Sequence, residues 1–362
     1  MANWREHVRK VTPYVPGFQP KEAGVIKLNT NENPYPPAPG VCEALRGFDA
    51  GALRKYPDPT ASVLVDALAS YHGLPPDRVF VGVGSDDVLA MAFMTFFDGG
   101  APILFPDVTY SFYPVWAGLF GIPYRTVPVG EGFVVRAGDY VGSGAGPADG
   151  NCRACGGIVL PNPNAPSGLA LPASDIEKIA AGNPGCVVII DEAYIDFGGE
   201  TCLPLLGKYD NLLVVRTYSK SRSLAGLRIG YALGCADLIR AMNDVKFSYN
   251  SYTLNTPTIL AGAKALEDEA YFCSTLQKIV ETREAAKREL AGLGFSFPDS
   301  AANFIFATHD RVSAPEIYAR LRDRGIYVRH FTSPGIDNHL RITVGTDGEM
   351  AALYGALEGI LG

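Results

Sequence analysis

Two stretches of the sequence place reactive side chains directly after apolar runs that have the pattern of buried strands. The apolar run 186–190 leads into Asp191. The run 212–216 leads through Ser219 to Lys220. A carboxylate can pair with a protonated ring nitrogen, and a lysine amine can form a Schiff base with an aldehyde. Taken singly, Asp191 could equally cap a helix or bind a metal, and Lys220 could be a solvated surface lysine.

A third stretch has the pattern of an anion-binding turn. The segment 81–87, Val-Gly-Val-Gly-Ser-Asp-Asp, runs from a predicted strand into a predicted helix. Free N–H groups at a helix N-terminus bind phosphate. Ser219 and Arg228, which lie close together in the sequence, could hold the same phosphate, the arginine through its planar guanidinium. A nicotinamide-dinucleotide fold competes for this pattern, but the run reads G-x-G-x-x-D and lacks the third glycine. A helix cap at Ser85 would also explain the segment.

Together the three stretches supply partners for each part of one cofactor, pyridoxal 5′-phosphate (PLP). The turn and Arg228 suit the phosphate, Asp191 suits the ring nitrogen, and Lys220 suits the aldehyde. Asp191 and Lys220 are 29 residues apart, which is enough for a strand–helix–strand path that returns to the same edge of a parallel sheet. Open α/β sheets bind ligands at that edge. The sequence therefore predicts PLP bound to Lys220.

The elements that must position these residues alternate between apolar runs and helical patterns. This alternation predicts an α/β domain with a mostly parallel central sheet flanked by helices. We expect its strands at 79–83, 102–105, 158–160, 186–190, 212–216 and 229–233. We expect its helices at 86–97, 110–120, 173–181 and 236–246.

A second pattern follows residue 257. A long helix is predicted over 258–290, where Ala, Glu, Lys and Leu are frequent, with Gly292 and Gly294 ending it. Strands at 303–307, 326–329 and 339–344 and helices at 315–324 and 348–360 then predict a smaller α+β domain. The chain thus divides into a proline- and asparagine-rich arm (1–40), a large PLP-binding domain (41–257), and a linking helix with a small domain (258–362).

Composition and charge exclude several classes of protein. The 362 residues are 47% hydrophobic and 19% charged, as in soluble globular proteins. A net charge of −7 without a basic run argues against nucleic-acid binding. The chain has no apolar run of about 18 residues, and its first 19 residues lack the apolar core of a signal peptide. We therefore expect a cytoplasmic protein that does not bind membranes.

The seven cysteines are odd in number and scattered, so no disulfide framework is expected. Cys152 and Cys155 form a single C-x-x-C in a stretch rich in Gly and Ala. A zinc site normally needs four ligands, and no second pair accompanies these two. We interpret them as two loop thiols and expect no metal.

With these residues the chain resembles the fold-type-I PLP-dependent aminotransferases, and within them the histidinol-phosphate aminotransferase family, over nearly its whole length. The Lys, Asp and Arg set is typical of the superfamily, whereas the arm and the segment 55–58 are typical of the subfamily. The matching segments are Thr-Pro-Tyr at 12–14, Leu-Asn-Thr-Asn-Glu-Asn-Pro at 28–34, Lys-Tyr-Pro-Asp at 55–58, Gly-Ser-Asp at 84–86, Thr-Tyr at 109–110, Asn-Pro-Asn-Ala-Pro-Ser-Gly at 162–168, Asp-Glu-Ala-Tyr at 191–194, Ser-Lys at 219–220, Leu-Ala-Gly-Leu-Arg at 224–228 and Leu-Arg-Ile-Thr-Val-Gly at 340–345.

The resemblance implies a role for each residue of the cofactor site. Lys220 is the Schiff-base lysine and the proton shuttle. Asp191 pairs with the ring nitrogen, Tyr194 hydrogen-bonds the ring hydroxylate, and Tyr110 stacks on the ring. The phosphate is held by the backbone N–H groups of Ser85 and Asp86, with Ser219 and Arg228.

The resemblance also implies a homodimer and an anionic small-molecule substrate. Tyr56 would reach the cofactor phosphate of the partner subunit, and the arm 1–40 would pack with the small domain and with the partner. Tyr14, Arg329 and Arg341 would bind the phosphate or carboxylate of the substrate. Without the resemblance, the two arginines would be interpreted as solvated surface residues.

The chain departs from the family pattern at one position. The family has asparagine directly before Pro-Thr/Ser-Gly, where its side chain reaches the ring hydroxylate. This chain has Ala165 there and Asn164 one residue earlier. Either the loop shifts by one residue so that Asn164 makes the contact, or Tyr194 makes it alone.

The expected activity is reversible transamination. The preferred reaction converts histidinol phosphate and 2-oxoglutarate to imidazole acetol phosphate and glutamate, a step of histidine biosynthesis. A threonine-phosphate decarboxylase or an aromatic amino acid aminotransferase on the same scaffold remains an alternative. A regulatory PLP-binding module is less favoured, because the arm is too short and too rich in proline for the usual DNA-binding appendage. A nicotinamide dehydrogenase is disfavoured by the missing glycine and by the setting of Lys220.

Overall fold

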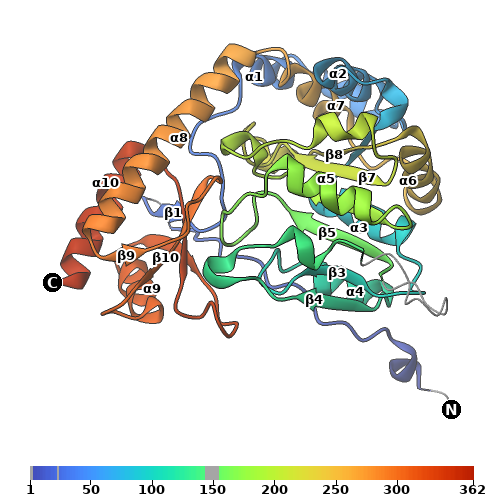
Figure 1. Cartoon of the computed structure of the whole chain (residues 1–362). Coiled ribbons are helices and arrows are strands. Elements are labelled where there is room, and N and C mark those ends of the chain that lie inside the picture. Colours follow the sequence, from blue (N-terminus) through green and yellow to red (C-terminus); the bar gives the residue numbers. More distant parts are fainter. Residues whose placement is uncertain (1–2, 23, 143–154) are drawn as a thin grey trace.

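Two β-sheets organise the chain, whose computed structural model describes residues 3–22, 24–142 and 155–362. The larger sheet has seven strands in the order β2-β8-β7-β6-β5-β3-β4, and the smaller has five in the order β1-β11-β12-β10-β9. Figure 1 shows the two sheets side by side, with the long helix α8 running from one to the other. The fold is therefore an α/β domain beside a smaller α+β domain.

The larger sheet is parallel except at β8, which is antiparallel to both β2 and β7. The carboxyl ends of β5, β6 and β7 thus meet at one edge. The strands of this sheet are β2 (Val79–Gly82), β3 (Ile103–Pro106), β4 (Tyr124–Val127), β5 (Gly157–Pro161), β6 (Val187–Asp191), β7 (Leu212–Thr217) and β8 (Gly230–Leu233).

Helices cover both faces of this sheet, and each face has its own apolar core. In β6, Val188 and Ile190 point into one core and Ile189 into the other. This is why the strand sequence is continuously apolar. One face packs on α3 (Ser85–Phe96), α4 (Tyr113–Phe120) and α6 (Ala236–Tyr249), and the other on α1 (Pro39–Arg46), α2 (Ser62–His72), α5 (Ala173–Gly182) and α7 (Thr256–Lys264).

The smaller sheet packs against three helices and recruits a strand from the arm. Strand β1 pairs in parallel with β11, with Ile26 opposite Ile326. The other strand pairs of this sheet are antiparallel. Its elements are β1 (Ile26–Leu28), β9 (Phe295–Ser296), β10 (Phe304–His309), β11 (Ile326–His330), β12 (Leu340–Thr343), α8 (Glu269–Gly292), α9 (Ala314–Asp323) and α10 (Asp347–Leu361).

The expectation of a single helix over 258–290 is wrong, because the chain forms α7 and α8 there with a break between them. Asp268 caps α8, since its carboxylate accepts a hydrogen bond from the Tyr271 N–H at 3.1 Å. Helices α1 and α2 and strands β1, β4 and β9 were not predicted. Short 3₁₀ turns occur at Trp4–His7, Ala50–Arg54, Pro76–Arg78, Glu131–Phe133, Ala137–Asp139, Ile195–Phe197, Leu203–Gly207 and Ala225–Leu227.

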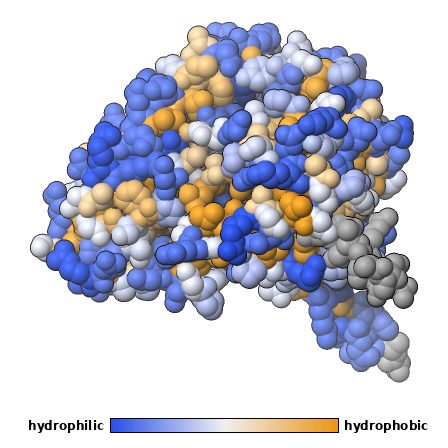
Figure 2. Space-filling model, in the orientation of Figure 1, coloured by the Kyte–Doolittle hydropathy of each residue, from blue (hydrophilic) through white to orange (hydrophobic). Residues whose placement is uncertain are grey.

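The surface in Figure 2 is mostly polar, with apolar residues gathered near the middle of the face shown. Within the described part of the chain, no helix combines the length and apolar character that crossing a bilayer requires.

Candidate active site

A cavity of about 160 Å³ lies at the carboxyl ends of β6 and β7. Eight of the residues predicted to bind the cofactor line it, and the arm closes it through Thr30 and Glu32. The eight residues are Ser85, Asp86, Tyr110, Asp191, Tyr194, Ser219, Lys220 and Arg228. The parallel sheet thus brings three separate stretches of sequence to one site.

A second cavity, of about 390 Å³, adjoins the first and shares Lys220, Tyr110 and Tyr194 with it. Tyr14, Arg329 and Arg341, the three residues predicted to bind the substrate, all line this second cavity. A larger groove of about 570 Å³ lies elsewhere, between α2 and α6. That groove contains none of the residues with predicted chemistry, so its size does not make it the site.

Lys220 is held by the arm. Its Nζ donates to the carbonyl oxygen of Thr30 at 3.2 Å and lies 5.7 Å from the centre of the Tyr194 ring. The Asn33 amide donates to the backbone carbonyl of Lys220 at 3.1 Å and to that of Ser221 at the same distance. The amine is thereby aimed into the cavity from a fixed backbone.

Asp191 ends β6 with its side chain buried. One carboxylate oxygen accepts from the Tyr113 hydroxyl at 3.1 Å and the other from the Ala193 N–H at 3.1 Å. Burial raises the pKa of Asp191 to about 6, and these two hydrogen bonds only partly oppose the effect. A positively charged partner would therefore stabilise the ionised form. Sequence reasoning missed Tyr113, which lies three residues after Tyr110 and is the first residue of α4.

The opposite end of the cavity is built from glycines packed against Arg228. A Cβ on Gly84 would lie 2.5 Å from the Arg228 guanidinium, and one on Gly230 would lie 2.2 Å from the Gly84 carbonyl carbon. Gly84 also has a φ of 84°, which other residues rarely adopt. Helix α3 begins directly after it, at Ser85. The free N–H groups of the first helical turn therefore lie beside a guanidinium, an arrangement that suits a phosphate.

Tyr110 and Asp86 lie between the two ends. The Tyr110 hydroxyl donates to Asp86 at 2.8 Å, and Asp86 lies 3.5 Å from Arg228. The hydroxyl oxygen of the buried Ser219 accepts a hydrogen bond from the Thr217 hydroxyl at 3.0 Å. The residues of this cavity fit PLP: a glycine turn with a guanidinium for the phosphate, a buried acid for the ring nitrogen, and a lysine for the aldehyde.

Asn164 is not among the residues that line either cavity. It is buried, and its amide donates to the carbonyl of Val108 at 2.9 Å. Ala165 lines both cavities instead. The loop has therefore not shifted in the way that would bring the Asn164 amide into the cavity, and Tyr194 is the polar side chain on that side.

The two substrate-site arginines are neighbours across strands. Arg329 on β11 pairs in register with Arg341 on β12. Burial and the charge of Arg329 lower the pKa of the Arg341 guanidinium, and the Arg341 Nε has no hydrogen-bond partner among the described residues. Two adjacent like charges, both half-buried, favour the binding of an anion. Tyr14 stacks on Phe112 with the ring centres 4.2 Å apart.

Tyr56 does not reach this chain's own cavities. Its side chain is 82% exposed and stacks on Tyr252, with 4.7 Å between the ring centres. Of the C-x-x-C pair, Cys152 lies outside the described residues, and Cys155 is a buried free thiol.

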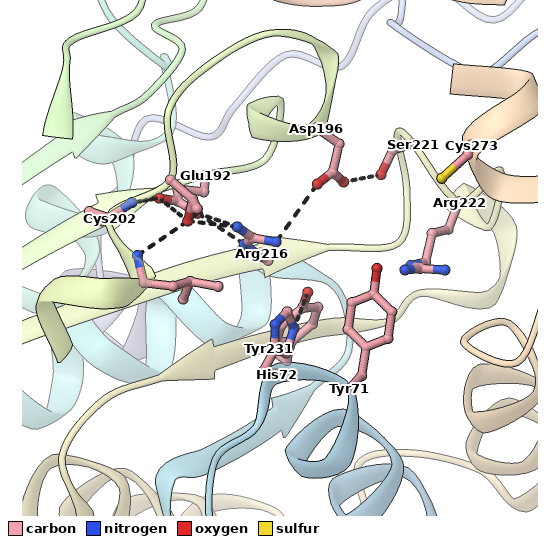
Figure 3. Close-up of polar contacts among 12 residues, drawn as sticks. Tyr71, His72, Glu192, Asp196, Cys202, Arg216, Ser221, Arg222, Tyr231 and Cys273 are labelled. Atoms are coloured by element: carbon pink, nitrogen blue, oxygen red, sulfur yellow. Dashed lines mark hydrogen bonds and ion pairs between the residues drawn. The ribbon is translucent and has the colours of Figure 1, made fainter. Parts of the chain in front are cut away.

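A polar network lies beside Asp191 and Lys220 and involves the residue that follows each of them. Figure 3 shows Arg216 between Glu192 and Asp196, with Ser221 bonded to Asp196. Arg216 donates to Glu192 at 2.7 and 2.9 Å, and the Ser221 hydroxyl donates to Asp196 at 2.5 Å. The Glu192 side chain is fully buried. This network ties the end of β6 to the segment that carries Lys220.

The comparisons with known proteins agree with this geometry. The sequence matches the family described as aminotransferase class I and II over residues 23–357. It is 53% identical over 358 residues to a histidinol-phosphate aminotransferase of Aromatoleum aromaticum, covering 99% of each chain. It is 52% identical over 362 residues to histidinol-phosphate aminotransferase 2 of Dechloromonas aromatica, again covering 99% of each. The structure of histidinol-phosphate aminotransferase from Sinorhizobium meliloti in complex with pyridoxal-5′-phosphate is similar with a TM-score of 0.84, at 27% identity, covering 93% of this chain and 90% of that one. As the sequence resemblance predicted, this chain belongs to the aminotransferase class I and II family.

Proposed function

We propose that the chain is a PLP-dependent aminotransferase whose cofactor is bound to Lys220. The observation that carries the proposal is the convergence of Lys220 and Asp191 on one cavity whose far end is the Gly84 turn with Arg228. When bound, PLP supplies an electron sink for the electrons of a broken Cα–H bond.

The residues of this chain would divide the remaining work. Lys220 carries the proton away from and back to the substrate Cα, because its amine projects between the two cavities. Asp191 keeps the ring nitrogen protonated, and burial makes it a strong partner for that cation. Arg341 and Arg329 bind the anionic group of the substrate in the second cavity.

We propose histidinol phosphate with 2-oxoglutarate as the substrate pair. The relatives above that carry the name histidinol-phosphate aminotransferase align over 99% of the chain. The pair of adjacent arginines suits the phosphate of such a substrate, and equally the carboxylate of the second substrate.

Spectra of the PLP-loaded protein mixed with single amino donors test this choice. Histidinol phosphate and glutamate should each bleach the absorbance of the bound cofactor, whereas phenylalanine and phosphothreonine should do so far more slowly. Release of carbon dioxide from phosphothreonine would instead indicate a decarboxylase. Lys220→Ala should abolish both turnover and the absorbance band. A protein that keeps its activity after this change would refute the proposal.

We further propose a cytoplasmic homodimer in which Tyr56 completes the partner's site. The support is the exposure of the Tyr56 ring, which does not line the cavities of its own chain. Mixed dimers of a Tyr56→Ala chain and a Lys220→Ala chain provide a test, because one of their two sites would combine an intact lysine with an intact tyrosine. Activity well above that of either parent supports the proposal, and activity no higher than that of the parents contradicts it.

A further inference from the structure

Asn31 is a buried arm residue with an unusual backbone. It is 1% exposed and has a φ of 56°, in the left-handed region that asparagine tolerates better than most residues. It follows β1 closely, so the pairing of β1 with β11 carries it to the second cavity, beside the cofactor cavity. Its carbonyl oxygen accepts from the Asn303 amide at 3.1 Å. A position this constrained is expected to serve a purpose.

The side chain of Asn31 joins the small domain to Tyr194. Its Nδ2 donates to the Tyr194 hydroxyl oxygen at 2.9 Å. Its Oδ1 accepts from the Thr343 hydroxyl at 3.0 Å, and its backbone N–H donates to the same Thr343 oxygen at 3.0 Å. With the Thr343 hydroxyl donating to Oδ1, the amide lies with Oδ1 toward Thr343 and Nδ2 toward Tyr194.

The hydroxyl proton of Tyr194 then remains available to donate a hydrogen bond. The hydroxyl oxygen accepts from Asn31, and among the described residues its own O–H donates to no protein acceptor. Tyr194 lines the cofactor cavity. We infer that Asn31 is a positioning residue that fixes the Tyr194 hydroxyl as a hydrogen-bond donor to the ring oxygen of the bound cofactor, a role that rests on the proposed PLP chemistry.

The need for such a residue follows from Ala165. With alanine at this position and with the Asn164 amide bonded to Val108, neither residue of this loop segment places an amide donor in the cavity. Tyr194 is then the donor on that side, so the direction of its single O–H matters more. The Asn31 amide supplies that direction through the tyrosine.

The ionisable groups around Tyr194 and Lys220 stay the same in the Asn31→Gly variant, whereas Asn31→Asp adds one charge beside Tyr194. Ionisable groups face the two residues from the arm, β6, α3, α4 and β12, and the substitutions at position 31 leave every one of them in place. They are Tyr14, Glu32, Asp86, Tyr110, Tyr113, Asp191 and Arg341, together with Arg228 and Arg329, which line the cavities that Tyr194 and Lys220 also line.

The test is a pH titration of the absorbance of the cofactor bound to Lys220. A donor to the ring oxygen withdraws negative charge from it and so lowers the pKa of the lysine–cofactor linkage. Tyr194→Phe should raise that pKa by about one unit or more, as expected for the loss of a hydrogen bond to a charged group. Asn31→Gly removes the amide and suits the left-handed φ, and it should raise the same pKa by a smaller amount.

Asn31→Asp sharpens the test, because it keeps the size of the side chain and the acceptor for Thr343. A carboxylate can only accept, so it would draw the Tyr194 O–H away from the cofactor. We expect a shift at least as large as that of Tyr194→Phe. Asn338→Asp, the same change at an exposed small-domain position away from the cavities, is the matched control and should leave the pKa unchanged.

The double variants decide whether Asn31 acts through Tyr194. In the Tyr194→Phe background, Asn31→Gly should shift the pKa no further, and Asn31→Asp should show only the residual effect of its charge. An equal shift from Asn31→Gly in both backgrounds, or no shift in either, overturns the inference. If Asn31→Gly does not fold, the comparison of Asn31→Asp in the two backgrounds decides in the same way. A protein without any Lys220-dependent cofactor band would instead overturn the proposed function.

Discussion

Replacing Asp191 by asparagine should stabilise the cofactor-free protein while destroying its chemistry. The carboxylate is 5% exposed and accepts hydrogen bonds from Tyr113 and Ala193. Asparagine has the same shape. Its Oδ1 can accept from the Ala193 N–H, and its Nδ2 can donate to the Tyr113 hydroxyl, which rotates to accept. The substitution therefore removes a buried charge without opening a cavity.

The magnitude follows from the pKa of about 6, which burial raises from the ordinary value of 3.8. The folded protein holds this proton more tightly than the unfolded chain does. At a pH below the Asp191 pKa of the unfolded chain, this tighter proton binding leaves the stability of the folded protein undiminished. The contribution is lost as the pH rises through the Asp191 pKa of the folded protein. A difference of about two units corresponds to about 3 kcal/mol of destabilisation by Asp191 at pH 8, about half of that at pH 5, and almost none at pH 3.

Urea unfolding of the cofactor-free proteins, at equal concentration and at several pH values, measures this effect. Asp191→Asn should be the more stable protein at pH 8, by up to about 3 kcal/mol, with the advantage shrinking toward pH 4. Loading with PLP should reverse the order, because the cationic ring nitrogen stabilises the carboxylate and not the amide. A variant that is no more stable than the parent at pH 8, or whose advantage does not change with pH, would refute the reasoning.

Three further substitutions test other parts of the site. Gly84→Ala brings a Cβ within 2.5 Å of the Arg228 guanidinium at a φ of 84°, so it should weaken PLP binding about tenfold or more, as measured by equilibrium titration. Arg216→Met leaves the carboxylate of Glu192 buried without its ion-pair partner, so it should cost about 3–5 kcal/mol in urea unfolding. Arg341→Gln removes a half-buried cation from the substrate cavity, so it should raise the KM of the anionic substrate about 10- to 100-fold with the cofactor spectrum unchanged.

Each of these variants has a matched control on the same chain. Gly118→Ala meets open space and should leave PLP affinity unchanged. Arg240→Met breaks only the exposed pair with Asp237 and should change stability by less than about 1 kcal/mol. Arg324→Gln lies at the exposed end of α9 and should leave KM unchanged. Equal effects in a variant and its control would show that the assigned contact is not the cause.

The meeting of Asp191 and Lys220 in one cavity was predictable because each lies at or close after the end of a buried strand. Asp191 is the last residue of β6 and Lys220 lies three residues after the end of β7, and in both cases a continuous apolar run marks the strand. Parallel pairing then brings strand ends together without further information. The Gly84 turn was predictable for the same reason, since it follows β2 and precedes a helix.

The contacts that complete the site were not predictable from local pattern. The bond from Asn31 to Tyr194 joins residues far apart in the chain and depends on the pairing of β1 with β11. Strand β1 has three residues, which is too short to show a period. The pairing of Glu192 with Arg216 also depends on register, because β6 and β7 must align for the two side chains to meet.

The pairing of β1 with β11 has a consequence for the order in which the protein folds. Ile26 pairs with Ile326, so β1 is synthesised about 300 residues before its partner. All seven strands of the larger sheet lie between the two in the sequence and can pair with one another before β11 is synthesised. Contacts of such long range form late, because closing a long loop costs entropy before the contact is made. The Thr30 carbonyl and the Asn31 amide therefore reach Lys220 and Tyr194 in a late step of folding, although they belong to an early part of the nascent chain.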